Sequence, residues 1–147
     1  MVRPLLIALA LAASACGASA APAPPIVFEP LPALAADAEP LLARALRSEL
    51  RANAEALRLT EGCRASARVR TDDRGGAGFD PGARAVAIDA EVDVALACPD
   101  EPTRDGSARA SALAPDGTGS AGRRRALEIA LAEAARFAVI DLADSER

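Results

Sequence analysis

Two segments of the chain alternate between apolar and polar residues, and each carries a cysteine at one end. In residues 63–69, a cysteine, two alanines and a valine alternate with arginine and serine. In residues 86–98, aliphatic residues and a final cysteine alternate with Ala, Asp and Glu. A period of two is typical of a strand with one buried face. The sequence therefore predicts two half-buried strands, with both cysteines on the apolar phase.

The first 20 residues have the order of a secretory signal peptide. Arg3 supplies a positive start, residues 5–13 form an apolar stretch, and small residues follow. This stretch is too short for a stable transmembrane helix, and no later segment is long and apolar enough to span a bilayer. We therefore expect export from a bacterial cytoplasm and a mature chain without a transmembrane helix.

Two cleavage positions fit this N-terminus. Residues 13–16, Ala-Ser-Ala-Cys, resemble a bacterial lipobox, with alanine at the position where leucine is usual. The resemblance implies that Cys16 is lipidated and becomes the first residue of a protein anchored on the periplasmic side of a membrane. Residues 18–20, Ala-Ser-Ala, fit an ordinary signal-peptidase site instead, which would release a soluble protein. Residues 16–25 are rich in Ala and Pro and suit a tether.

The cysteine count predicts one disulfide. Either cleavage route removes Cys16 from consideration, so Cys63 and Cys98 remain as a pair in an oxidising compartment. A metal site is disfavoured because the chain has no histidine and no CxxC motif. Closing a loop of about 35 residues would contribute about 4 kcal/mol in the chain-entropy model.

The charges of the two strands agree with this bridge. If the strands are antiparallel and the cysteines lie opposite each other, apolar positions face apolar positions. Arg68 then lies opposite Asp93, and Arg70 lies opposite Glu91. A slip of one residue would turn one apolar set to solvent. The pattern thus predicts a specific register.

The remaining segments complete a single α+β domain over residues 26–147, after a signal peptide over residues 1–20. Their patterns predict a short edge strand between prolines, a helix of about 18 residues, a loop, a turn, a third hairpin strand and a last helix. The helix of about 18 residues starts near Asp37, Glu39 and Pro40 and carries an apolar stripe from Leu42 to Leu57; the other segments are 26–28, 71–82, 99–106, 107–114 and 120–142. We expect a small antiparallel sheet of three to four strands with two helices packed on one face.

The last helix carries apolar residues on two sides. Alanine and leucine follow one stripe, while Ile129, Phe137 and Ile140 lie toward another. We therefore expect this helix to be covered on more than one face.

Composition excludes several classes of function. All 17 basic residues are arginine, which we attribute first to the codon bias of a GC-rich genome. A net charge of −4 disfavours nucleic-acid binding. Absence of histidine and lysine removes the commonest general base and Schiff-base chemistry. We expect no cofactor, no metal and no catalytic residue.

Two charged motifs are candidate sites. Arg123, Arg124 and Arg125 stand at a predicted helix N-terminus, where the macrodipole disfavours cations. They could serve an envelope protein or an anionic lipid or glycan, although a solvated helix end is the simpler interpretation. The alternating carboxylates of residues 89, 91 and 93 could form a site, but ion pairing with arginine explains two of them.

The N-terminus resembles those of bacterial envelope lipoproteins. The element order and the tether also resemble the LPS-assembly lipoprotein and the lipoproteins that activate penicillin-binding proteins. The resemblance implies a non-enzymatic lipoprotein that acts as a binding or assembly module. The alternatives are a secreted soluble protein and an envelope hydrolase that uses Asp or Glu.

Overall fold

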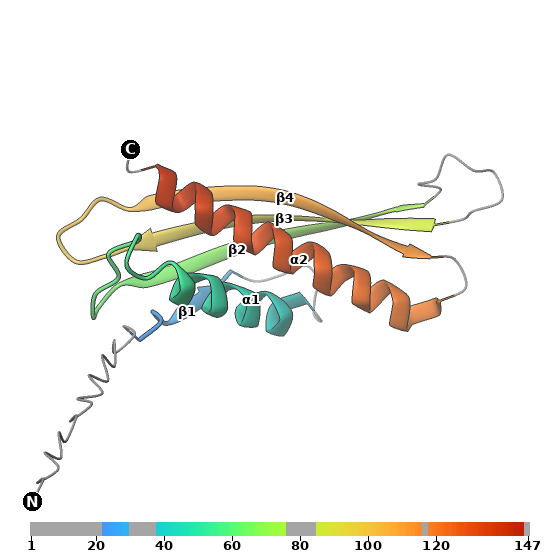
Figure 1. Cartoon of the computed structure of the whole chain (residues 1–147), viewed down its shortest axis with the longest axis horizontal. Coiled ribbons are helices and arrows are strands. Elements are labelled where there is room, and N and C mark those ends of the chain that lie inside the picture. Colours follow the sequence, from blue (N-terminus) through green and yellow to red (C-terminus); the bar gives the residue numbers. More distant parts are fainter. Residues whose placement is uncertain (1–21, 30–37, 76–84, 116–117, 146–147) are drawn as a thin grey trace, which may run out of the picture.

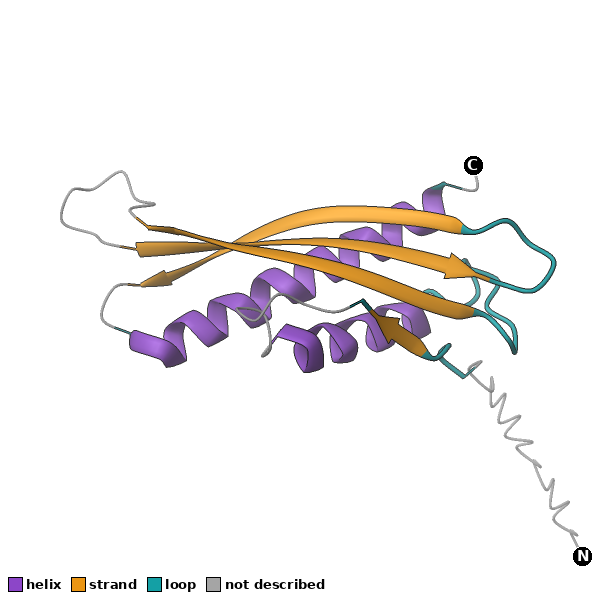
Figure 2. Cartoon of the chain, turned by 180° about the vertical axis from the view of Figure 1, so that it is seen from behind, coloured by secondary structure: helices purple, strands orange, loops and turns teal. Residues whose placement is uncertain are grey.

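The computed structural model of the chain describes residues 22–29, 38–75, 85–115 and 118–145. One sheet and two helices make up the fold, and both helices lie on the same face of the sheet (Figure 1, Figure 2). In chain order the elements are β1 (Ile26–Phe28), α1 (Ala38–Ala52), β2 (Arg64–Gly75), β3 (Ala85–Ala97), β4 (Arg104–Pro115) and α2 (Gly119–Asp144). The strands are ordered β1-β2-β3-β4, as in the chain.

The sheet is mixed. β1 pairs with β2 in parallel, while β2–β3 and β3–β4 are antiparallel. The predicted antiparallel arrangement is therefore correct for three strands and wrong for β1. A parallel neighbour requires a crossover connection, and here α1 lies between β1 and β2 in the chain. The predicted α+β class, with two helices on one face, is confirmed.

The register between β2 and β3 is the predicted one. Ala65 lies opposite Leu96, and Val69 lies opposite Val92. Arg68 lies opposite Asp93, as the charge pattern indicated. The apolar phase of these strands faces the helices, and the charged phase forms the face without helices, which we call the outer face. Because the side chains of a strand alternate, this single register places every residue of both strands.

Aliphatic side chains from both helices fill the core. In α1, Leu42, Leu46 and Leu50 are fully buried. In α2, the buried positions are mostly alanines, among them Ala130 and Ala138. Small side chains allow a helix axis to approach the sheet closely. The result is a thin layer with little apolar area per residue, so each buried leucine contributes a large share of the total.

Several boundaries differ from the predicted ones. α1 ends at Ala52, and Leu57 is buried from the turn that follows rather than from the helix. β2 continues to Gly75, into the predicted loop. β4 begins at Arg104, inside the predicted turn. In both strands the pairing with β3 extends the ladder past residues of low strand propensity, since tertiary pairing overrides local preference.

One side of α2 is open to solvent. Ile129 is 41% exposed, Phe137 50% and Ile140 38%. The helix is covered on more than one face, because it contacts α1 as well as the sheet, but the side that carries these three residues is not covered in the single chain. Neither described helix is both long enough and apolar enough to cross a bilayer.

The features predicted for the N-terminus lie mostly outside the described residues. The signal peptide, the lipobox with Cys16 and the first part of the tether precede Pro22. The last tether residues are described and lie against the domain. Pro24 is buried, and the backbone N–H of Ala65 donates to the Pro25 carbonyl oxygen at 3.3 Å. The tether therefore joins the fold just before β1.

Candidate functional site

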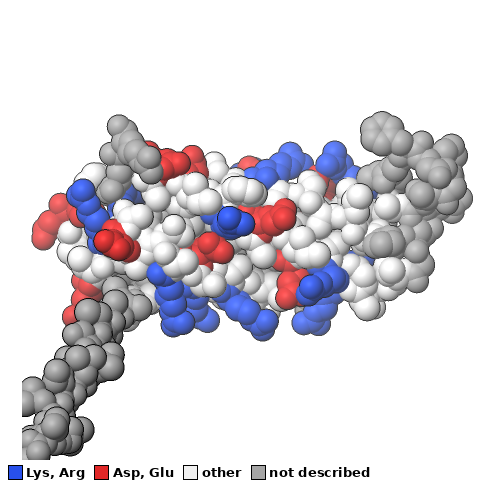
Figure 3. All heavy atoms as spheres, viewed as in Figure 1, with Lys and Arg blue, Asp and Glu red and all other residues white. Residues whose placement is uncertain are grey.

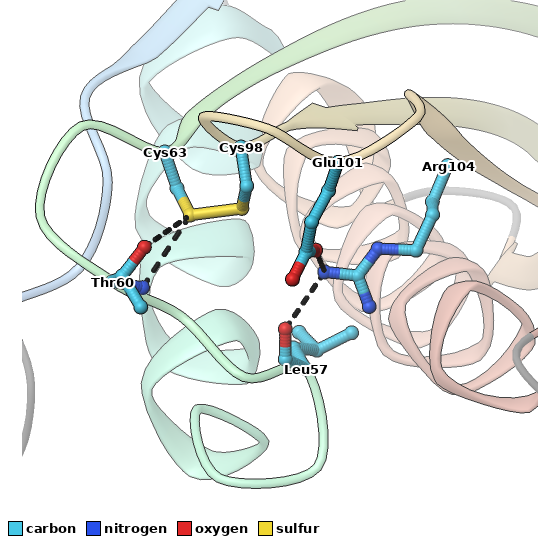
Figure 4. Close-up of a disulfide and its surroundings, with 6 residues drawn as sticks. All are labelled: Leu57, Thr60, Cys63, Cys98, Glu101 and Arg104. Carbon is cyan, nitrogen blue, oxygen red and sulfur yellow. Dashed lines mark hydrogen bonds and ion pairs between the residues drawn. A yellow bond between two sulfur atoms is a disulfide. The ribbon is translucent and has the colours of Figure 1, made fainter.

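The predicted disulfide is present. Cys63 and Cys98 are bonded at the ends of β2 and β3, close to the turn that follows α1 (Figure 4). The backbone N–H of Thr60 donates to the Cys63 sulfur at 3.4 Å. Cys63 is 1% exposed and Cys98 is partly buried against the core, so the bridge is not a reactive surface thiol pair. Its role in the fold is structural.

Arg104 is a buried cation that sequence reasoning missed. It is 9% exposed at the start of β4, on the strand phase that faces the helices. Its guanidinium donates to the Leu57 carbonyl oxygen at 2.8 Å and lies 3.5 Å from the Glu101 carboxylate (Figure 4). These contacts join the turn after α1 to the β3–β4 connection. The available signal was an arginine in phase with Ala108, but that position fell within a predicted turn.

The arginine run at the start of α2 is divided among different partners. Arg123 donates to Asp73 of β2 at 2.6 Å, and Arg125 lies 3.3 Å from Glu128 in its own helix. Arg124 is exposed and makes no ion pair with any residue that the structure describes. Two of the three predicted binding cations are thus engaged within the chain. The run is not a cluster of three available charges.

The outer face carries a network of ion pairs. Arg70 lies 3.7 Å from Glu91 and 3.4 Å from Asp93. Arg68 lies opposite Asp93 in the register but donates to Glu29, just after β1, at 2.6 Å. The predicted pairing of Arg70 with Glu91 is confirmed, while Arg68 bonds a carboxylate that lies 39 residues away in the chain.

Asp89 is the most buried carboxylate of this ion-pair network. It lies on the outer face, yet its side chain is only 3% exposed because neighbouring strands cover it. Arg74 of β2 contacts it at 2.6 Å, and Arg109 of β4 contacts it at 3.1 Å. The hydroxyl of Ser111 also donates to it. Hydrogen bonds from Arg74, and then from Ser111, lower the pKa of Asp89 to about 2. Asp89 is therefore a fixed anion that links three strands.

Acid should weaken this link in a defined range of pH. Because the pKa of Asp89 falls from an ordinary 3.8 to about 2 on folding, its stabilisation is complete above pH 3.8 and is lost as the pH falls toward 2. The paired guanidiniums are 60% exposed, so solvent screening limits the effect to on the order of 1 kcal/mol. We expect the free energy of unfolding of Asp89→Asn to lie below the wild-type value at neutral pH and to converge with it in acid.

Urea unfolding at a series of pH values measures this difference. Asp93→Asn is the matched control, because its carboxylate is more exposed and lies 3.4 Å from Arg70. A difference between wild type and Asp89→Asn that stays constant down to pH 2 would contradict the assignment.

Two of the surface hollows formed by the described residues bear on the candidate sites. The first, of about 400 Å³, is on the outer face and is lined by Glu29, Arg68, Asp93 and Asp105, among others. The second, of about 820 Å³, lies between β1 and α1. We call the second hollow the α1 groove. Apolar side chains of β1 line one wall, and the α1 face that carries Arg44, Arg47 and Arg51 lines the other.

The chemistry of the outer-face hollow bears on the hydrolase alternative. A general acid near neutral pH needs a carboxyl whose pKa is raised. Here the hydrogen bond from Arg68 lowers the pKa of Glu29. Asp141, at the rim, accepts a hydrogen bond from the Ser107 backbone at 3.0 Å. No group of three or more Cys, Asp or Glu residues in the described ranges could hold a metal ion. The hollow gathers carboxylates but holds Glu29 in the anionic form.

Comparison with known proteins identifies the fold and no family. No protein-family model matches the chain, and no curated protein matches its sequence. A minor lipoprotein from Acinetobacter baumannii has a similar structure, with a TM-score of 0.52 at 14% identity, over 84% of this chain and 95% of that one. A "putative lipoprotein" from Caulobacter crescentus CB15 aligns with a TM-score of 0.46 at 19% identity, over 82% and 89% of the two chains. The chain thus shares its fold with a bacterial minor lipoprotein.

Proposed function

We propose that this chain is a cell-envelope lipoprotein, anchored through Cys16, that works as a non-enzymatic binding or assembly module. The fold likeness to a minor lipoprotein carries the proposal, because it extends over 84% of this chain and 95% of that one. The N-terminal pattern supports it independently, since the lipobox-like residues 13–16 precede the described fold by only a few residues. The disulfide between Cys63 and Cys98 also suits a periplasmic location, because disulfides persist in oxidising compartments.

Two carboxylates of the outer face are unsuited to act as a catalytic acid, which favours binding over catalysis. Asp89 is held as an anion by two arginines and a serine, and Glu29 is held as one by Arg68. Neither can act as a proton donor near neutral pH. The outer face instead offers a broad polar surface over three strands, which suits contact with another macromolecule. Within this class, the observed element order supports the resemblance to the LPS-assembly lipoprotein.

Mass spectrometry of protein purified from the native host's membranes tests the anchor. We expect a mature N-terminus at Cys16 carrying a diacylglyceryl group, and no such species from Cys16→Ser. Two acyl chains, at about 0.8 kcal/mol per buried CH₂, would keep the protein in the membrane fraction. An unmodified N-terminus at Ala21 would instead support the secreted alternative.

Complementation separates the module from the hydrolase. Glu29→Gln and Asp93→Asn each replace one carboxylate of the outer-face hollow with an amide of the same shape, and Asp105→Asn and Asp141→Asn do the same for the other two. We propose that these variants restore the function of a deletion strain. If the module acts in LPS assembly, they should also restore the level of surface lipopolysaccharide. Full loss of function by a variant that is folded and normally abundant would favour carboxylate catalysis.

A further inference from the structure

The α1 groove combines apolar and cationic walls. Ile26 and Phe28 of β1 are partly buried and line one side. Arg44, Arg47 and Arg51 are exposed and line the other. Their spacing of three and four residues places them on one face of the helix. Figure 3 shows arginine side chains spaced along the edge of the molecule where α1 lies in Figure 1.

The three arginines of the groove are available for binding. None of them makes an ion pair with a residue that the structure describes, in contrast to Arg123 and Arg125. Glu39 is the one carboxylate among the described lining residues, so the groove has a local excess of positive charge. The overall charge of the protein is −4, which makes this local excess distinct from the general surface. The structure thus places three accessible cations on one groove wall of α1, although these arginines are not consecutive in the chain.

We propose that the α1 groove docks the domain on an anionic phospholipid bilayer. The guanidiniums fit the phosphates of glycerophospholipid headgroups, because arginine donates bidentate hydrogen bonds to phosphate oxygens. The apolar wall formed by Ile26 and Phe28 suits the glycerol and first acyl carbons below a headgroup. Both walls line the same groove, so a single lipid layer can contact the arginines and the apolar side chains at once.

The position of the groove in the chain supports this occupant. β1, which forms the apolar wall, begins ten residues after the proposed anchor at Cys16. A chain of that length spans at most about 35 Å. A lipid on Cys16 would therefore keep the groove within reach of the membrane surface. The docking proposal rests on the proposed anchor to keep the groove near a membrane. The binding of phosphate by the groove does not depend on that anchor.

Vesicle binding by the full chain tests the proposal. All forms carry Cys16→Ser, so that acylation does not contribute to binding and all variants share the same N-terminus. The probes are phosphatidylcholine vesicles and vesicles of equal parts phosphatidylcholine and phosphatidylglycerol. We expect tighter binding to the anionic vesicles, and a loss on the order of a hundredfold in that gain for Arg44→Ala/Arg47→Ala/Arg51→Ala, at about 1 kcal/mol per arginine near an anionic surface.

The matched control is Arg123→Ala/Arg124→Ala/Arg125→Ala, which removes the same number of charges at the start of α2. It should keep most of the gain, because two of its arginines already have partners in the chain. Equal losses from the two triple variants, or full retention by the α1 variant, would overturn the proposal. Thermal melting of both variants checks folding. A protein without a lipid on Cys16 could still bind vesicles in this way, so the two proposals can fail separately.

Discussion

Replacing both Cys63 and Cys98 with serine should lower the melting temperature by roughly 10–20 °C. The disulfide closes a loop of 35 residues, which restricts the unfolded chain by about 4 kcal/mol in the chain-entropy model. The core is thin and rich in alanine, so little other burial compensates for the loss. Circular dichroism melts of the variant and the wild type measure the effect.

Two controls belong to this experiment. Wild-type protein melted in the presence of a reductant should approach the double variant, because both lack the covalent link. Cys16→Ser should melt like the wild type, because it leaves both cysteines of the bridge in place. Identical melting temperatures for oxidised and reduced wild type would contradict a stabilising bridge.

The central hairpin could be predicted from the sequence because independent patterns agree on it. The apolar alternation, the two cysteines and the opposite charges at positions 68 and 93 all favour the same register, and a one-residue slip breaks all three. The class of the fold follows from that hairpin and from two amphipathic segments. Local patterns were sufficient here because each residue's partner is set by a single antiparallel pairing.

Contacts between more distant elements could not be predicted in this way. β1 has only three residues, which is too short for a pattern that would reveal its parallel pairing. Its position brings Glu29 to Arg68, so Arg68 pairs with Glu29 and not with the expected Asp93. Asp89 obtains its partners from β2 and β4 at once, and Arg74 lay in a segment predicted as a loop. These pairs depend on where whole strands lie.

The arginines that share a surface were also not predictable from local sequence patterns. Three consecutive arginines attract notice in a sequence, but successive helix positions are about 100° apart and point to different neighbours. Arg123 accordingly contacts β2, while Arg125 contacts its own helix. Arg44, Arg47 and Arg51 are separated by other residues, yet the helix brings them to one groove wall. Spacing along a helix therefore predicts a shared surface better than density along the chain.

Gly106→Ala is expected to lower the free energy of unfolding by about 1–3 kcal/mol, because it overpacks the contact between α2 and β4. A methyl group at this position would overlap the carbonyl oxygen of Ala138 and lie 2.6 Å from the backbone nitrogen of Leu142. Both are backbone atoms of α2, so no side-chain rotation can relieve the overlap. The helix must move away from the edge strand.

That movement has a local signature. The Ser107 backbone N–H on the open edge of β4 donates to the Asp141 carboxylate of α2, and this bond depends on the close approach that Gly106 permits. An exposed strand edge with unpaired N–H groups is prone to pairing with other chains, so the bond also covers part of that edge. Hydrogen exchange at Ser107 should be faster in Gly106→Ala than in the wild type.

Gly122→Ala makes the same chemical change in α2 with a different expected result. The new methyl group would overlap the hydroxyl oxygen and Cβ of Thr118, so this residue before the helix must shift, while alanine favours a helix over glycine by up to about 1 kcal/mol. This variant should therefore leave hydrogen exchange at Ser107 unchanged, because its overlap lies at the start of α2 and not at the contact with Gly106. If Gly106→Ala were neutral, with unchanged exchange at Ser107, α2 would not pack on β4 through its backbone. The thin, alanine-rich layer between helix and sheet would then need another explanation.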